Sequence, residues 1–236
     1  MKSRLYALGW KTLDLIFPPR CAGCDQWGER YCASCQEQTK LISSPLCQIC
    51  GEPISGGEDA TCRRCRASVI FYSAIRSWAY FEGPLQKAIH KLKYKKDLGL
   101  SEILAQPMIQ LLVEQKWKID LITAIPLDEI KQRERGFNQS LYLARPIAWR
   151  NKVMIKPSAI RRVKITRSQV GLSLEERKKN VADVFSAERE LVSGKTILVV
   201  DDVVTTGSTI NSCAAALSKA GALKIYGLTL ARSMRL

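Results

Sequence analysis

The cysteines of this chain are spaced in a way that suits metal binding. Eight of the nine lie between residues 21 and 65, as four pairs that each enclose two residues. The pairs are Cys21 and Cys24, Cys32 and Cys35, Cys47 and Cys50, and Cys62 and Cys65. A tight turn of this length presents two sulfurs to one ion, and two such turns supply the four thiolates of a tetrahedral zinc site. The spacing therefore predicts two structural zinc ions.

Sequential pairing is the simplest way for these cysteines to share the ions, and a cross-braced arrangement is the alternative. Disulfides conflict with an N-terminus that lacks the features of a secretory signal. A redox Cys-x-x-Cys normally occurs once, at the start of a helix. An iron–sulfur cluster stays an alternative, although regular pairs are more typical of zinc. Because the segment has few large apolar residues, we expect the metal to hold it folded.

A second group of residues suits a sugar phosphate. An apolar run over 197–200 is followed by Asp201 and Asp202 and then by a turn rich in hydroxyls. The turn comprises Val203, Val204, Thr205, Thr206, Gly207, Ser208 and Thr209. Backbone N–H groups at the start of the next helix attract a terminal phosphate, and Gly207 lets the backbone approach it closely. Two carboxylates at the end of a parallel strand can accept hydrogen bonds from ribose hydroxyls.

An ordinary helix start explains less of this motif. Ser208 or Thr209 alone would suit an N-capped helix. Capping does not account for two adjacent aspartates directly before the turn. The motif is also not a P-loop, because no Gly-Lys-Ser/Thr sequence follows it. The sequence therefore favours a site for a phosphorylated sugar.

The chain around these motifs alternates between strand and helix patterns from about residue 67 onward. Strands are expected over 74–81, 121–127, 196–200 and 225–230, and helices over 84–94, 99–115, 138–150, 174–184 and 208–220. This alternation predicts an α/β domain with a mostly parallel sheet flanked by helices. Before the cysteines, residues 3–16 have the spacing of a short amphipathic helix, which Phe17-Pro18-Pro19 would end. Cys213, on the last expected helix, is predicted to be a small core residue.

The basic residues are concentrated in one part of the chain. The formal net charge is +15, and residues 131–180 contain fourteen Lys and Arg against three Asp and Glu. This concentration favours polyanions, either a phosphorylated small molecule or a nucleic-acid backbone, with a solvated basic surface as the alternative. No apolar run approaches the ~18 residues of a membrane span. We therefore expect a cytoplasmic protein without a membrane span.

Several stretches together carry a resemblance to a known family. The segment 197–209 resembles the phosphoribosyl pyrophosphate (PRPP) loop of type I phosphoribosyltransferases. Further matching stretches are 89–94, 125–127, 133–140, 169–172, 176–177 and 180–181. With the cysteine pairs they resemble the ComF family, which includes competence protein F and GntX-like proteins, over nearly the whole chain. The resemblance implies an N-terminal helix over 1–19, a double zinc ribbon over 20–66 and a type I phosphoribosyltransferase domain over 67–236.

The resemblance also implies roles for individual residues. Asp201 and Asp202 would be the catalytic pair that holds the ribose, and residues 203–209 would bind the 5′-phosphate of PRPP, with Mg²⁺ on its pyrophosphate. The backbone at Pro126 and Leu127, together with Arg135, would hold the pyrophosphate. A mobile loop with Arg167, Gln169 and Arg177 would close over PRPP. From spacing alone, capping by Asn138 beside solvated arginines is the simpler interpretation of residues 133–139, and a solvated basic loop suits 161–180 equally well.

Two functional hypotheses follow. The first is a ComF-like phosphoribosyltransferase-type protein that binds PRPP with Mg²⁺, displaces pyrophosphate at the ribose anomeric carbon, and takes part in DNA uptake. The resemblance adds single-stranded DNA and DNA-uptake proteins as partners. The second is a non-catalytic scaffold that keeps the fold and binds nucleic acid or a protein partner. In either case we expect DNA contacts to run through residues 131–180, because the cysteine module is nearly neutral before it binds metal.

Overall fold

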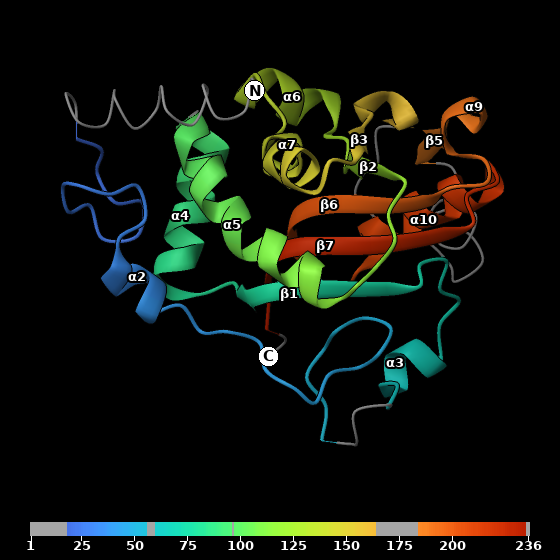
Figure 1. The fold of residues 1–236 in the computed structure, drawn as a ribbon, viewed down its shortest axis with the longest axis horizontal. Helices are drawn as coiled ribbons and strands as arrows, with labels where there is room; N and C mark the ends of the chain where they lie inside the picture. The colour runs from blue at the N-terminus through green and yellow to red at the C-terminus, as the bar shows by residue number, and fades with distance from the viewer. Residues whose placement is uncertain (1–17, 56–59, 96, 164–183, 235–236) are drawn as a thin grey trace, which may run out of the picture.

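A five-stranded parallel sheet forms the centre of the molecule (Figure 1). The computed structural model describes residues 18–55, 60–95, 97–163 and 184–234. The strand order is β1 (Ala74–Tyr80), β7 (Lys224–Arg232), β6 (Thr196–Val204), β2 (Leu121–Ala124) and β3 (Met154–Ile155). The predicted α/β architecture with a parallel sheet is confirmed.

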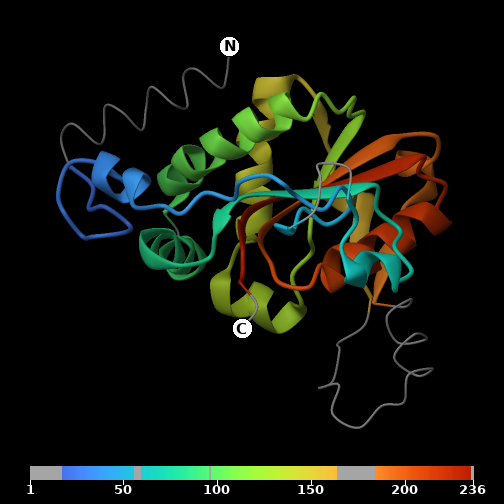
Figure 2. The same cartoon turned by 90° about the horizontal axis from the view of Figure 1, so that it is seen from below.

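Helices cover both faces of this sheet. The side chains of β6 alternate between the two faces, which explains why the apolar run of this strand is continuous. Leu198 and Val200 pack in one cluster with α4 (Gly83–Tyr94), α5 (Leu98–Glu114) and α7 (Gln139–Asn151). Ile197 and Val199 point the other way and pack with α10 (Ser208–Lys219), including the buried Cys213 (Figures 1 and 2). Successive residues of a strand face opposite sides, so a strand covered on both faces needs apolar residues throughout.

Several strand ends differ from those expected, and two of these differences lie at the aspartate pair. β2 stops at Ala124 instead of 127, and Pro126, which lacks an N–H, cannot extend the ladder. β6 runs on to Val204 instead of ending at 200, because residues 201–204 keep their pairing with β7 as far as Arg232. Since Ala124 pairs with Val200, Asp201 and Asp202 lie just beyond the end of β2. β2 therefore does not cover the two aspartates, and side chains of α4 and α7 reach them instead.

One of the helices that the sequence patterns did not predict lies close to the aspartate pair. Arg133 and Arg135 were expected in a polar turn before the helix over 138–150, yet Glu129–Arg135 forms α6. The Asp128 carboxylate accepts a hydrogen bond of 2.8 Å from Lys131 N at its start, and Gly136 ends it with φ 71°. The helix buries no residue, so it has no apolar stripe for a pattern to detect.

The shorter elements lie around this frame. They are α2 (Ala33–Glu37), α3 (Arg63–Arg66), the 3-10 turn Pro157–Ala159, α9 (Arg189–Val192) and an antiparallel pair of strands, β4 (Ile160–Arg162) with β5 (Phe185–Ala187). The expected helix over 3–16 lies outside the described residues, and so does the expected helix over 174–184 apart from Val184, which is not helical. Within the described part of the chain, no helix is long and apolar enough to cross a membrane.

The cysteine-rich segment covers the outer edge of the sheet. Tyr80 N donates to Lys40 O at 2.9 Å, Ile42 N donates to Trp78 O at 3.2 Å, and Ile75 N donates to Ile49 O at 2.7 Å. These bonds satisfy backbone groups of β1 that an edge strand otherwise leaves unpaired. The segment is therefore packed along β1 and is part of the same structure as the sheet.

Candidate functional site

The eight paired cysteines form two four-sulfur clusters. One cluster holds Cys21, Cys24, Cys32 and Cys35, the other holds Cys47, Cys50, Cys62 and Cys65, and the sulfurs of each lie within 4.8 Å of one another. The two sulfurs in each of the pairs Cys21/Cys35 and Cys24/Cys32 are 3.6 Å apart. Two ligands of one tetrahedral zinc are about 3.8 Å apart when each Zn–S bond is about 2.3 Å, whereas a disulfide is about 2.05 Å long. Sequential pairing is confirmed, and the cross-braced alternative is wrong.

Backbone groups prepare one sulfur of each cluster for metal. The N–H groups of Gly23 and Cys32 donate to Cys21 Sγ, both at 3.4 Å. Burial alone raises the pKa of the Cys21 thiol, but hydrogen bonds from the backbone outweigh burial and lower the pKa to about 6. The same balance lowers the pKa of Cys47 to about 6. Zinc binds the thiolate form, so these donor sets fit structural zinc ions.

Asp201 and Asp202 have different partners, although they are neighbours. Asp202 is 4% exposed. Its carboxylate lies 2.6 Å from Lys93 Nζ and accepts a hydrogen bond of 3.2 Å from Gln139 Nε2. Asp201 Oδ1 accepts 2.8 Å from Ser140 Oγ. Asp201 Oδ1 also accepts a hydrogen bond of 2.9 Å from Asp202 N. Asp202 is thus held by a lysine and an amide side chain, while Asp201 is held by a hydroxyl and a backbone N–H.

The protonation of this pair follows from these contacts. Burial, and then the negative charge of Asp202, raise the pKa of Asp201 to about 8. Burial also acts to raise the pKa of Asp202, but the Lys93 ammonium outweighs it and the pKa of Asp202 is lowered. Two adjacent carboxylates in a buried site cannot both ionise easily. Near neutral pH the pair therefore carries about one negative charge, on Asp202.

The turn after β6 leaves its polar groups available. Thr205, Thr206, Ser208 and Thr209 are exposed, and no side chain caps α10. Within the turn, Ser208 N donates to Thr206 Oγ1 at 3.2 Å. Gly207 has φ 80°, a conformation that a side chain would strain. The N–H groups of the first helical turn and the hydroxyls around them form a suitable place for an anion.

The end of β2 and the start of α7 lie beside this pair. Ile125 N donates to Val200 O at 3.0 Å, and Asn138 Nδ2 donates to Ile125 O at 2.9 Å. Asn138 also caps α7, accepting from Ser140 N at 2.9 Å, so the predicted capping is confirmed. The backbone at Pro126 and Leu127 leaves β2 at this point, next to the aspartates in β6.

Arg135 reaches the aspartates through another side chain. Its Nη1 donates 2.9 Å to Gln139 Oε1, and Gln139 in turn donates to Asp202. The guanidinium lies 5.3 Å from the centroid of the Tyr94 ring. Arg135 is therefore a partner of the aspartate network and not simply a solvated arginine. The predicted loop residues Arg167, Gln169 and Arg177 lie outside the described residues.

Sequence reasoning did not single out Lys93, Gln139 or Ser140 for the aspartate pair. All three lie in stretches that carry the family resemblance, which was the only available signal. Lys93 is 109 positions before Asp202, so no local spacing connects them. A lysine side chain that is only 19% exposed needs a counter-ion, but a sequence does not state which carboxylate provides it.

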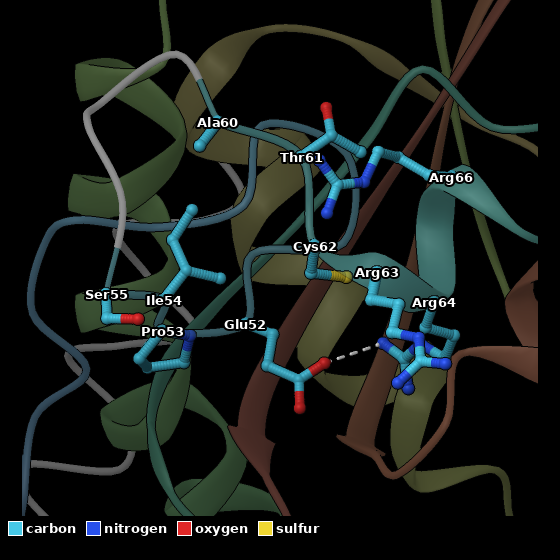
Figure 3. A pocket seen from close by; sticks show the side chains of 10 residues that line it. All are labelled: Glu52, Pro53, Ile54, Ser55, Ala60, Thr61, Cys62, Arg63, Arg64 and Arg66. Atoms are coloured by element: carbon cyan, nitrogen blue, oxygen red, sulfur yellow. Dashed lines mark ion pairs between the residues drawn. The ribbon is translucent and has the colours of Figure 1, made fainter.

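A hollow of about 600 Å³ lies against the second cysteine cluster (Figure 3). Its lining includes Arg63, Arg64 and Arg66 of α3, together with Glu52. Arg64 Nη2 is 3.1 Å from Glu52 Oε2, and Arg63 and Arg66 are exposed. This group of arginines lies outside residues 131–180, where the sequence predicts nucleic-acid contacts.

Comparisons with known proteins agree with both halves of this description. Residues 12–66 match a double zinc ribbon domain, and residues 153–235 match a phosphoribosyl transferase domain. The DNA utilization protein YhgH of Salmonella typhi is 32% identical over 213 residues, which cover 88% of this chain and 92% of that protein. Competence protein F of Haemophilus influenzae is 28% identical, covering 86% and 90%, and competence protein ComFC of Bacillus subtilis is 23% identical, covering 95% and 89%.

The chain belongs to the ComF family. In this ComF protein the zinc-ribbon match contains all eight clustered cysteines, and the transferase match contains the aspartate pair and the turn 205–209. Lys93, Gln139 and Ser140, which hold the aspartates, lie outside both matches. The partners of the aspartates therefore come from a part of the ComF chain that neither domain match covers.

Proposed function

We propose that this ComF protein binds PRPP with Mg²⁺ at the edge of its sheet and takes part in the handling of DNA during uptake. The observation that carries the first part is the aspartate pair beside an uncapped, hydroxyl-rich turn. In this proposal the N–H groups and hydroxyls of 205–209 bind the 5′-phosphate. Asp201, the less buried of the two aspartates, accepts from a ribose hydroxyl.

The remaining groups suit the pyrophosphate end of the ligand. The backbone at Pro126 and Leu127 lies next to the aspartates, and Arg135 supplies a forked donor nearby. Mg²⁺, when bound, neutralises pyrophosphate and makes it a better leaving group. Lys93 keeps Asp202 ionised, and this carboxylate would face the positive charge that develops at the anomeric carbon. A phosphoribosyl transfer is therefore the reaction that we assign to this site.

The test is a calorimetric titration of PRPP with Mg²⁺ into the zinc-loaded protein and into the Asp201→Asn, Asp202→Asn double variant. We expect micromolar binding that the variant loses. Asp120→Asn is the matched control, because Asp120 accepts from Thr196 N at the opposite end of the sheet. If the folded wild-type protein does not bind PRPP, the proposal is wrong.

Nucleic-acid binding is a second candidate, and the arginine-lined hollow beside the second cysteine cluster favours it. The names of the relatives, DNA utilization protein and competence protein, point in the same direction. Arginine side chains bind phosphate well, and such binding weakens steeply with salt. The proposal includes single-stranded DNA and DNA-uptake proteins as partners. It also places the protein in the cytoplasm, where cysteines stay reduced for zinc.

Fluorescence anisotropy with a labelled single strand tests this second candidate. We expect Arg63→Ala, Arg66→Ala to weaken binding and to reduce the salt dependence by about one to two phosphate contacts. Lys219→Ala, Lys224→Ala removes the same charge elsewhere on the exposed surface and serves as the control. Equal weakening by both double variants would mean that net charge alone attracts DNA.

A further inference from the structure

The segment that joins the second cysteine cluster to β1 contacts the phosphate-binding turn. Phe71 N donates 2.9 Å to Asn211 Oδ1, and Asn211 Nδ2 donates 3.0 Å to Val69 O. Asn211 is the fourth residue of α10. Both the oxygen and the nitrogen of its side-chain amide are hydrogen-bonded, so the orientation of the amide is fixed. The two bonds attach residues 69–71 to the first turn of α10, next to the turn 205–209 (Figure 2).

Two side chains from the same part of the chain lie directly behind Gly207. A β-carbon on Gly207 would be 3.3 Å from the Tyr72 hydroxyl and 3.4 Å from Ile75 Cδ1. Tyr72 is 7% exposed and Ile75 is fully buried. The turn therefore rests on a packed surface, and this surface, with the positive φ of Gly207, restricts the path of the backbone.

The other side of this segment is fixed to the second cysteine cluster. Ile75 N donates to Ile49 O at 2.7 Å, between the ligands Cys47 and Cys50. A side chain on Gly51 would collide with the Ile75 carbonyl, so the cluster and β1 are in close backbone contact. The buried Arg232 of β7 donates to Cys50 O. A continuous series of contacts thus runs from the zinc ligands through residues 69–75 to Gly207.

We propose that residues 69–72, held in place by the second zinc ribbon, position the turn 205–209 for phosphate binding. Asn211 and Tyr72 are the positioning residues. Within the turn, Thr206 and Ser208 are hydrogen-bonded to each other, and residues 69–72 add contacts from outside the turn. A turn that is already ordered binds its ligand without losing further conformational entropy. This inference rests on the proposed function, since it assumes that the turn binds a phosphate.

The experiment compares Asn211→Ala with Asn151→Ala in the zinc-loaded full chain. Asn151 also makes a side chain to backbone hydrogen bond, of 2.8 Å to Ile147 O, but at the far end of α7. Hydrogen exchange of the amides of residues 205–209 is measured without ligand. Calorimetry then measures binding of ribose 5-phosphate and, separately, of magnesium pyrophosphate. Ribose 5-phosphate carries the group that the turn would bind, and pyrophosphate does not.

We expect Asn211→Ala to speed hydrogen exchange in the turn and to weaken the binding of ribose 5-phosphate about ten-fold, as for the loss of one or two hydrogen bonds. Binding of magnesium pyrophosphate should not change, whereas a general loss of structure would weaken both ligands. Tyr72→Phe removes the hydroxyl behind Gly207 but keeps the ring, so it should have a smaller effect than Tyr72→Ala, which should behave like Asn211→Ala.

The two proposals fail in different ways. If exchange in the turn is unchanged in both Asn211→Ala and Tyr72→Ala, the positioning role is wrong, whatever the protein binds. If wild-type protein binds neither PRPP nor ribose 5-phosphate, the proposed function fails, and the positioning role for phosphate fails with it. Weakening of both ligands to the same degree also overturns the positioning role.

Discussion

The two zinc ribbons have the same set of ligands but support different parts of the molecule. The first, around Cys21–Cys35, packs beside α4, where Lys91 Nζ donates 3.1 Å to Cys21 O and 2.6 Å to Asp25 Oδ1. The second, around Cys47–Cys65, packs against the start of β1 and the segment that leads to Asn211. Figure 1 shows α2 of the first ribbon beside α4 and α3 of the second ribbon near the opposite end of β1.

The parts of the chain that the two ribbons contact carry different residues of the site. Helix α4 carries Lys93, two residues after Lys91, and Lys93 is the counter-ion of Asp202. The segment beside the second ribbon carries Tyr72, which lies behind Gly207. The first ribbon therefore lies beside the helix that carries the counter-ion of Asp202, and the second lies beside the segment that contacts the turn 205–209. Two metal sites that look alike should differ in which ligand contacts they affect.

The largest effect is expected from removing each zinc in turn. Cys47→Ser, Cys50→Ser and Cys21→Ser, Cys24→Ser should each reduce the zinc content from two ions to one and lower stability by several kcal/mol. Loss of the second ribbon should abolish binding of ribose 5-phosphate, while loss of the first should leave it within a few-fold. Zinc analysis and calorimetry measure this, and equal losses would remove the distinction between the ribbons.

The next effect concerns the two lysines of α4. Lys93→Met leaves the buried Asp202 without its cation and should cost about 3–5 kcal/mol in the free energy of unfolding. Lys91→Met breaks an ion pair to Asp25, whose side chain is 66% exposed, and should cost less than about 1 kcal/mol. Urea denaturation measures both. Similar costs would show that Lys93 is not a buried counter-ion.

The two aspartates should also differ in how they link stability to pH. The pKa of Asp201 is raised, to about 8, so its contribution is full below its unfolded pKa and is lost as pH rises toward 8. The pKa of Asp202 is lowered, so its contribution is present at neutral pH and is lost in acid. Asp201→Asn should remove a fall in stability of up to about 1.4 kcal/mol per pH unit between pH 5 and 8. Denaturation curves across this range provide the check, and identical slopes in both proteins would contradict it.

The smallest expected effect comes from substituting two glycines. Comparing them separates the cost of backbone strain from the cost of a lost contact. Gly207 and Gly194 both have positive φ, of 80° and 71°, but only a β-carbon at Gly207 would meet other atoms. Gly207→Ala and Gly194→Ala should each cost about 1–2 kcal/mol of stability. Only Gly207→Ala should also weaken the binding of ribose 5-phosphate, which calorimetry measures. Weakening by Gly194→Ala as well would mean that lost stability alone explains the effect.

Local patterns predicted the parts of the molecule that depend on local spacing. The cysteine pairs predicted both clusters, and the apolar run before Asp201 predicted the central strand, because its side chains are covered on both faces. Helix α6 had signals at Asp128 and Gly136, but without a buried face its polar residues looked like a turn. The site is less predictable, since Lys93 meets Asp202 and Phe71 meets Asn211 across more than 100 positions. Such pairs follow from the strand order and not from spacing.

The segment that covers β1 affects whether copies of this protein can pair with one another through that strand. The backbone groups of β1 that face away from β7 are bonded to residues 40–49. A chain cut to begin at residue 67 would present that strand bare, and an exposed strand edge pairs readily with a copy of itself. The ribbons therefore cover the open edge of the sheet, and we expect the shortened chain to pair through β1 at an edge that the full chain keeps covered.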